Sequence, residues 1–465
     1  MRMASRTLPW LAALLAGCAV TRVEPPPPAA PTAQFKEAGA WQRAAAGTPV
    51  PDAWWTLFGD PVLDDLQHRL VIGNENLKAS VAQVASARAA YEASRSATAP
   101  TLSLGLGATR GTGASTGGVG TSRAVSNNVS LTATAGWEID LWGRLAEATR
   151  AAQATLQASS DDLASARLSA QALLAQTYFS LRAADAQAAL LERSVQAYTR
   201  SLELTQARYD SGVAARTDVL QAQTQLRSAQ AQLADTVAQR AQLEHAIAVL
   251  LGLPPVDLTL AVAPTLPAPP AVPPLLPSTL LERRPDIAAA ERRVASAYAQ
   301  IGVADAAYFP DLTLSASAGY RGSTLANLVR APNLVWSLGP SLALSLLDGG
   351  QRRLASAQAR ASADQAGATY RQAVLTALQE VEDNLVLARQ LELEAQMQAD
   401  ALQAAQRNLE ITLDQYRGGT VSYLNVVTAQ AAALTSESSL ITVRNRQLAA
   451  VNQLLKNIAG RWQAE

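Results

Sequence analysis

Apolar residues recur at every seventh position over long tracts of this chain. One row consists of Leu174, Leu181, Ala188, Val195, Leu202 and Tyr209, and a second of Val381, Ala388, Ala395, Leu402, Leu409 and Tyr416. A sustained seven-residue period predicts long α-helices that supercoil with a left-handed twist. The tract from residue 144 to 209 alone predicts a helix roughly 100 Å long. On this pattern by itself, a coiled-coil rod is the expected fold.

Four short segments follow a different pattern, in which apolar residues alternate with small or polar ones. The alternating positions are Leu102, Leu104 and Leu106; Leu131, Ala133, Ala135 and Trp137; Leu312, Leu314, Ala316, Ala318 and Tyr320; and Trp336, Leu338, Leu342, Leu344 and Leu346. This period of two predicts strands at 101–110, 127–138, 311–321 and 334–347. It is also typical of strands in an outer-membrane β-barrel, whose apolar side chains face lipid.

Three aromatic residues lie near the ends of these predicted strands. Trp137, Tyr320 and Trp336 occupy positions where an outer-membrane protein carries its aromatic girdles. The alternative is that they are ordinary core aromatics. Each pair of strands brackets a polar, glycine-containing loop, which suits an extracellular rim.

The chain also repeats itself, because residues about 207 to 210 positions apart match in order. Pro100 begins Pro-Thr-Leu-Ser-Leu and Pro310 begins Pro-Asp-Leu-Thr-Leu, while Tyr209-Asp210-Ser211-Gly212 matches Tyr416-Arg417-Gly418-Gly419. A period this long is not that of a short solenoid repeat. The sequence therefore predicts a duplicated half, with the same order of elements in each copy.

Proline positions mark the organisation of the chain. None of the 23 prolines lies between Pro100 and Pro254 or after Pro340, and prolines interrupt helices and strand ladders. We expect a signal peptide, an N-terminal linker, a first repeat, a Pro-rich linker and a second repeat. Their boundaries are 1–17, 18–60, 61–253, 254–277 and 278–460, with long helical hairpins at 144–250 and 350–460.

The N-terminus has the pattern of a lipoprotein signal. Arg2 and Arg6 precede the short apolar run Leu8–Ala16, and the pattern ends at Cys18, the only cysteine of the chain. We expect Cys18 to carry the covalent lipid that anchors the protein; the alternative is a small buried residue beside an ordinary cleavage site. Ala19, rather than an aspartate, follows it, which indicates the outer membrane.

Charge and motifs argue against several classes of function. Lys and Arg balance Asp and Glu at 38 each, so no basic surface for nucleic acid is indicated. His68 and His245 are far apart and have no motif partner, and no nucleophile or metal site is recognisable. We expect neither an enzyme nor a cofactor, apart from the lipid on Cys18. Pro285 and Asp286 are expected to open a helix rather than form an acid–base site.

Four strands are too few to close a barrel around a lumen, since about eight is the usual minimum. Two separate hairpins would also be marginally stable. The chain must therefore associate with further copies of itself if its strands line a pore.

Several motifs resemble one family. Trp54-Trp55-Thr56-Leu57-Phe58-Gly59-Asp60-Pro61-Val62-Leu63 is similar to the N-terminal signature of TolC-like outer-membrane factors of tripartite efflux systems, in the NodT and OprM-type branch. The segment Glu282–Ile287 resembles the second-repeat signature, and Trp137–Arg144 and Leu347–Gly350 resemble the strand-to-helix junctions. The resemblance covers residues 38 to 460.

This resemblance implies a homotrimer in which four strands per chain form a 12-stranded outer-membrane β-barrel. The long antiparallel helices would continue it as an α-barrel into the periplasm. The function implied is that of a passive exit duct for small molecules, lipid-anchored in the outer membrane. The partners implied are a periplasmic adaptor protein and an inner-membrane RND-type transporter, which supplies the energy.

The helical-hairpin turns are then expected at the periplasmic tip, as a gate and an adaptor contact. The residues concerned are Tyr209, Asp210, Gly212, Tyr416, Arg417, Gly418 and Gly419. The three glycines can adopt positive φ, which a tight reversal needs. Asp210 and Arg417 stand at equivalent positions with opposite charge, so our hypothesis is that they pair between neighbouring hairpins and latch the tip closed.

Two alternatives to small-molecule efflux remain open from the sequence. One is a duct for type I protein secretion, and the other is a coiled-coil envelope lipoprotein without a pore. The sequence does not indicate the exported substrate.

Overall fold

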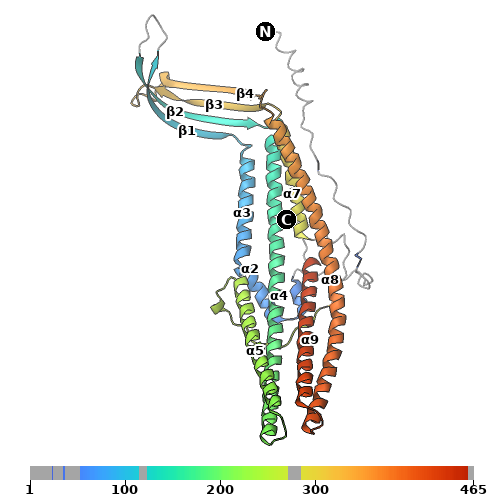
Figure 1. Cartoon of the computed structure of the whole chain (residues 1–465). Helices are drawn as coiled ribbons and strands as arrows, with labels where there is room; N and C mark the ends of the chain where they lie inside the picture. The colour runs from blue at the N-terminus through green and yellow to red at the C-terminus, as the bar shows by residue number, and fades with distance from the viewer. Residues whose placement is uncertain (1–23, 25–34, 37–52, 115–122, 271–283, 459–465) are drawn as a thin grey trace. The chain divides into compact units, whose positions relative to one another are not determined.

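The computed structural model describes residues 24, 35–36, 53–114, 123–270 and 284–458 (Figure 1). Cys18 and the signal segment lie outside these residues. The elements, in order, are η2 (Trp54–Phe58), α2 (Pro61–Gly73), α3 (Glu75–Ser96), β1 (Thr101–Ala114), β2 (Arg123–Ile139), α4 (Arg144–Asp210), α5 (Arg216–Leu250), η3 (Pro255–Asp257), α7 (Pro285–Ala306), β3 (Asp311–Gly322), η4 (Ala331–Asn333), β4 (Leu334–Ala343), α8 (Gln351–Arg417) and α9 (Tyr423–Ile458).

The duplication is visible element by element. The series α3–β1–β2–α4–α5 is followed by α7–β3–β4–α8–α9 in the same order. Helices α4 and α8 have 67 residues each, and α3 and α7 have 22 each. The long helices end and reverse at equivalent positions in both repeats. The two repeats therefore share the same backbone up to and including the hairpin turns.

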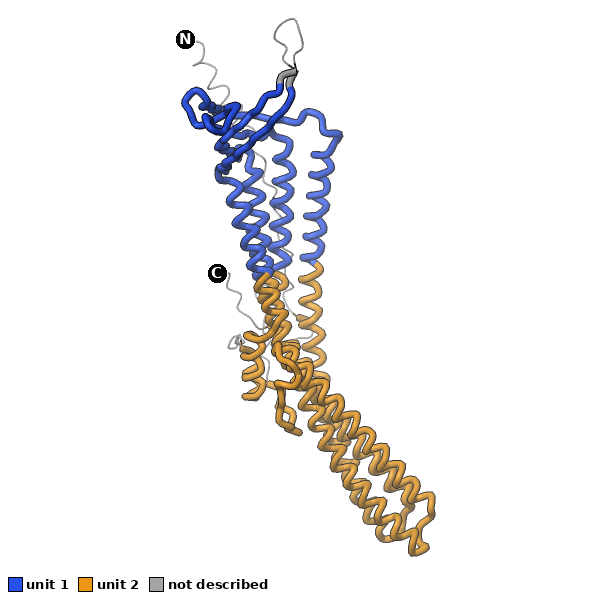
Figure 2. The backbone as a smooth tube through the Cα atoms, turned by 90° about the vertical axis from the view of Figure 1, so that its left-hand side faces the viewer, with its two compact units in different colours: residues 1–28, 83–160, 289–371 blue, residues 29–82, 161–288, 372–465 orange. Residues whose placement is uncertain are grey.

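The chain divides into two compact units, and neither unit is a single repeat (Figure 2). Unit 1 comprises residues 1–28, 83–160 and 289–371, and unit 2 comprises residues 29–82, 161–288 and 372–465. The expected repeats therefore do not act as separate domains. The physical reason is that the sheet of unit 1 pairs strands from both repeats, and the core of unit 2 buries apolar residues from both repeats.

Unit 1 contains one four-stranded antiparallel sheet with the order β1-β2-β3-β4. The strands of the two repeats join where β2 pairs with β3. Two separate two-stranded hairpins would be only marginally stable, and the pairing of β2 with β3 joins them into one continuous sheet.

The pairing register sorts side chains onto two different faces of this sheet. Residues directly opposite each other share a face. One face carries Leu102, Leu104, Leu106, Leu131, Tyr320, Leu334, Trp336 and Leu338, and the other carries Thr101, Gly136, Ser315, Gly339, Ser103, Thr134, Ser317 and Ser337. Leu102 and Trp336 on the apolar face are about three-quarters exposed, at 78% and 75%. The sheet thus has one large-apolar face and one small, polar face.

The strand limits differ from the predicted ones. β1 and β2 are longer than expected, whereas β4 ends at Ala343, short of the predicted residue 347. Ala343 pairs with Asp311, the first residue of β3, so nothing in β3 remains for the following residues to pair with. Leu344 and Leu346 continue the apolar alternation without forming a strand.

The core of unit 2 is built around the Trp-rich N-terminal segment. Trp54 and Phe58 of η2 are buried with Leu174 and Phe179 of α4, and residues of α2, α5, α8 and α9 complete the cluster. The rings of Phe58 and Phe179 lie 4.7 Å apart. This segment therefore supplies buried aromatic side chains to the core between the long helices.

Helix α7 begins at Pro285 with Asp286 in its first turn, as expected. The first repeat begins its equivalent helix differently, because the Asn74 side chain accepts a hydrogen bond from the Leu77 amide at 3.0 Å. Within the described residues, no helix is both long and apolar enough to cross a membrane.

Candidate functional site at the hairpin tips

Both helical hairpins reverse through the same type of turn. The Gly212 amide donates to the Tyr209 carbonyl at 2.9 Å, and the Val213 amide donates to the Arg208 carbonyl at 2.8 Å. In the second hairpin, the Gly419 amide donates to the Tyr416 carbonyl and the Thr420 amide to the Gln415 carbonyl, both at 3.0 Å. This pair of bonds is the Schellman pattern at a helix C-terminus.

The turn glycines do not all serve the same purpose. Gly212 and Gly419 have a φ of +76° each, which only glycine adopts without strain. Gly418 was expected to share this role, but it is not among the described glycines with positive φ. It stands at the position of Ser211, one residue before the reversal, where the helical backbone is still compatible with a side chain.

An arginine of the first hairpin connects the two hairpins at the tip. Arg208 of α4 donates from Nη1 to the Tyr416 carbonyl of α8 at 2.9 Å, and its guanidinium lies 4.7 Å from the centre of the Tyr416 ring. A cation over an aromatic face and a charge-assisted hydrogen bond both stabilise this contact. Tyr416 is only 4% exposed, so it is held inside the tip.

Tyr423 of α9 packs behind this contact. The Tyr416 and Tyr423 rings lie 5.4 Å apart, and the Thr205 and Tyr416 hydroxyls are 3.5 Å apart. Burial, followed by the nearby Tyr416, raises the pKa of Tyr423 to about 12, so its hydroxyl stays neutral. We call Thr205, Arg208, Tyr416 and Tyr423 the tip cluster.

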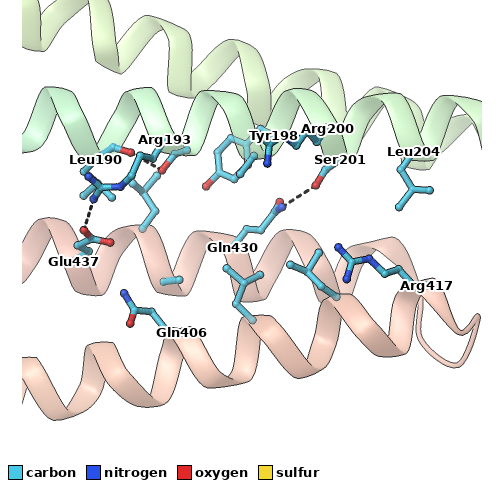
Figure 3. Close-up of a pocket in the computed structure, with 16 residues that line it drawn as sticks. Leu190, Arg193, Tyr198, Arg200, Ser201, Leu204, Gln406, Arg417, Gln430 and Glu437 are labelled. Atoms are coloured by element: carbon cyan, nitrogen blue, oxygen red, sulfur yellow. Dashed lines mark hydrogen bonds and ion pairs between the residues drawn. The ribbon is translucent and has the colours of Figure 1, made fainter.

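Further along the helices, the two hairpins line a groove (Figure 3). Gln430 of α9 donates to the Ser201 hydroxyl of α4 at 3.0 Å, and Arg193 pairs with Glu437 at 2.6 Å. Arg200 and Arg417 also line this groove together with several leucines and alanines, so its lining mixes polar and apolar side chains. Polar contacts of this kind can be exchanged for water at little cost, unlike an apolar seam.

The expected pair of Asp210 and Arg417 does not form within the chain. Asp210 accepts a hydrogen bond from Gln206 at 2.8 Å, and Arg417 pairs with Asp414 at 3.0 Å. Both partners lie on the same helix as the residue they bind. Tyr209, which is 38% exposed, does not share the buried setting of Tyr416. Pairing between chains stays a prediction.

Sequence reasoning missed Arg208, Thr205 and Tyr423. Two of them stand where the repeats disagree, since Gln415 replaces Arg208 and Arg216 replaces Tyr423 at the equivalent positions. A systematic search for differences between the halves would have found these two. Thr205 gives no such signal, because its role depends on the distance between two hairpins.

The expected interface aromatics lie in the sheet of unit 1. Trp137 is near the end of β2 and donates from Nε1 to the Thr98 carbonyl at 2.9 Å. Tyr320 pairs with Leu334 near the opposite end of β3, and Trp336 pairs with Ala318 close by. All three aromatics lie on the apolar face, and their place at a membrane interface stays a prediction. The expected lipid site, Cys18, lies outside the described residues.

Within the described part of the chain, no group of three His, Cys, Asp or Glu residues is arranged to hold a metal ion.

The fold and the duplicated hairpins define a class of protein, and comparisons with known proteins name it. The model of the family described as "Outer membrane efflux protein" matches residues 66–253 and 276–460, one segment in each repeat. The chain belongs to this family. It is an outer-membrane efflux channel, and the predicted fold class, four strands per chain with long antiparallel helices, is confirmed.

Relatives match over nearly the whole chain. The toluene efflux pump outer membrane protein TtgF of Pseudomonas putida is 30% identical over 464 residues, covering 97% of this chain and 96% of that protein. The pyoverdine export outer membrane protein OpmQ of Pseudomonas aeruginosa is 31% identical over 434 residues, covering 91% of each.

Solved structures agree with the fold. The outer-membrane channel OprN has a TM-score of 0.88 at 30% identity and covers 96% of this chain and 100% of that one. The open state of the Neisseria gonorrhoeae MtrE outer membrane channel has a TM-score of 0.82 at 26% identity, covering 95% of this chain and 98% of that one. Membership of a channel family argues against a coiled-coil lipoprotein without a pore.

Proposed function

We propose that three copies of this chain form a passive exit duct for small molecules. The edges of the sheet support this proposal, because β1 and β4 each have only one neighbouring strand among the residues that the structure describes. An unpaired edge favours pairing with another chain. Three sheets would close into twelve strands, with the apolar face toward lipid and the small, polar face toward the lumen.

The duct needs partners to supply energy and connection. We assign these roles to an inner-membrane RND-type transporter and a periplasmic adaptor, which would first meet the turns 209–212 and 416–419. All residues of these turns except Tyr416 are exposed. The relatives' names refer to efflux of toluene and export of pyoverdine, which favours small molecules over secreted proteins. Beyond the lipid proposed on Cys18, this function requires no cofactor.

We place the gate at the tip cluster. The observation that carries this assignment is the contact of Arg208 with both the carbonyl and the ring of Tyr416, because it joins two hairpins at their ends. Each of these interactions is worth about 1–2 kcal/mol. Since every chain of a trimer has one copy, breaking the contact would act three times on the same opening.

The test is single-channel conductance of the purified, full-length protein in planar bilayers. Arg208→Gln, which places the residue of the equivalent position there, should raise conductance and open time. Arg200→Gln is the matched control, since Arg200 is exposed on the same helix and lines the neighbouring groove. Equal conductance of Arg208→Gln and the wild type would argue against the gate. No conductance in any variant, including the wild type, would argue against the duct.

A further inference from the structure

A row of polar side chains on α4 is buried away from the tip. Tyr178, Arg182 and Asp185 follow one another at i, i+4 and i+7, and therefore lie on one side of the helix. They are 1%, 4% and 1% exposed. Polar groups are seldom buried to this extent without specific partners.

At one end, this row binds the N-terminal segment. The Tyr178 hydroxyl donates to Asp60 Oδ2 at 2.6 Å, and Oδ1 of the same carboxylate accepts from the Val62 amide at 2.9 Å, which caps α2. The Arg182 guanidinium lies 4.7 Å from the centre of the Tyr178 ring. Burial and the Asp60 carboxylate raise the pKa of Tyr178, so its hydroxyl remains a donor.

At the other end, the row binds the linker between the repeats. Arg182 donates to the Ala261 carbonyl at 2.8 Å, and Asp185 accepts from the Ala263 amide at 3.1 Å. From α5, Arg240 donates to the Leu260 carbonyl and Glu244 accepts from the Leu260 amide, both at 2.6 Å. Four backbone groups of residues 260–263 are thus held by charged side chains.

The charges at the linker end of this network balance. Asp185 forms ion pairs with Arg182 at 2.9 Å and with Arg240 at 2.8 Å, and Arg240 also pairs with Glu244 at 2.9 Å. Two cations therefore face two carboxylates in a nearly dry setting. Removal of one partner would leave an uncompensated buried charge. Each member of the network therefore depends on the others for its stability.

The second repeat shows that the fold does not require this network. At the equivalent positions, Leu385 stands for Tyr178, Gln447 for Arg240 and Val451 for Glu244. The helices of the second hairpin nevertheless have 67 and 36 residues, against 67 and 35 in the first. Arg182 and Asp185 have charged counterparts in Arg389 and Glu392, so Tyr178, Arg240 and Glu244 are what the first repeat adds.

We propose that Asp60, Tyr178, Arg182, Asp185, Arg240 and Glu244 form a clasp that couples the N-terminal segment to the inter-repeat linker. The clasp couples two contacts with α4. The segment Trp54–Leu66 and the linker residues 258–263 then bind the helix together or not at all. The linker can then leave α4 and α5 only if the N-terminal segment loosens as well. This inference rests on contacts within one chain and does not depend on the gate.

The test is hydrogen exchange, read by mass spectrometry, on the purified full-length protein. Tyr178→Phe removes the bond to Asp60 and keeps the ring under Arg182. We expect amides 260 and 263 to exchange about three- to tenfold faster, although neither contacts the changed hydroxyl. Coupling is reciprocal, so Glu244→Gln should speed exchange at the N-terminal segment by a similar factor.

Tyr198→Phe is the matched control, since Tyr198 is 4% exposed on the same helix but outside the clasp. It should leave both segments as in the wild type. If Tyr178→Phe loosens the N-terminal segment but leaves the linker amides unchanged, the contacts are independent and the clasp does not exist. Equal acceleration by Tyr178→Phe and Tyr198→Phe would reduce the effect to general destabilisation and also overturn the proposal.

Discussion

The first and second helical hairpins share a backbone but not their interactions. Helices α4 and α8 have 67 residues each, and each pair of helices reverses through a glycine at φ +76°. The first hairpin buries charge, with Asp185 at 1% exposure, whereas Glu392 at the equivalent position of the second hairpin is exposed. The second hairpin instead buries aromatic rings at its tip, where the first hairpin exposes Tyr209.

This difference separates what the duplicated fold needs from what the protein adds. Apolar rows and turn glycines occur in both repeats, because every long hairpin needs a seam and a reversal. Arg208 and the clasp residue Tyr178 have no counterpart of the same type in the second repeat. A channel wall can be built from two copies of one module, whereas the proposed gate and the proposed clasp use positions at which the copies differ.

The largest expected effect comes from removing the central charge of the first hairpin. Asp185→Asn leaves Arg182 and Arg240 facing a neutral amide and should lower the free energy of unfolding by about 3–5 kcal/mol. Glu392→Gln, its counterpart in the second hairpin, should change it by less than about 0.5 kcal/mol, because the side chain is exposed. Denaturant unfolding of both variants at equal protein concentration measures the difference. Similar effects of the two changes would mean that the hairpins are energetically alike.

An intermediate effect is expected at the turns, where the hairpins should behave alike. Gly212→Ala and Gly419→Ala each force a side chain into the left-handed region, at a cost of about 1–2 kcal/mol. Gly418→Ala should be neutral or slightly stabilising, because its backbone accepts a side chain. Thermal unfolding of the three variants tests this order. A loss at Gly418 equal to that at Gly419 would contradict the assignment of the reversal to Gly419.

Local sequence patterns predicted the parts of this molecule that depend on local physics. The heptad rows predicted the long helices, the alternation at Leu102–Leu106 predicted β1, and Pro285 predicted the start of α7. The end of β4 could not be predicted in this way, because Leu344 and Leu346 continue the alternation. The limit is set by the length of the partner strand, which is a property of the pair.

The candidate site was predictable only in outline. The turns were located correctly from their glycines, but the charge pair was sought at Asp210 and Arg417, whose partners prove to be local. The contact that joins the hairpins uses a backbone carbonyl of Tyr416, and a carbonyl gives no signal in the sequence. The clasp was missed for the same reason, since Arg182 and Glu244 bind the backbone of a linker that is distant in sequence.

The smallest expected effect comes from the way the two repeats begin their equivalent 22-residue helices, α3 and α7. Asp286 opens α7 and is held by Arg284 at 2.7 Å, whereas Glu75 opens α3 and pairs with Lys78 at the exposed surface. Burial would raise the pKa of Asp286, but the hydrogen bond and charge of Arg284 outweigh it and leave the pKa below its usual value. Because the folded-state pKa is lowered, the stabilisation is present at neutral pH and is lost as the pH falls through that value.

Asp286→Asn should therefore lower the free energy of unfolding at pH 7 by less than about 1 kcal/mol, since the partly exposed pair is screened by solvent. The difference from the wild type should shrink below about pH 4, where the carboxylate begins to protonate even in the unfolded chain. Glu75→Gln should show almost no difference at either pH. Unfolding curves from pH 3 to 7 measure both variants. A loss in the free energy of unfolding of Asp286→Asn that persists unchanged at pH 3 would show that the carboxylate acts through packing. The starts of α3 and α7 would then differ in side-chain packing rather than in charge.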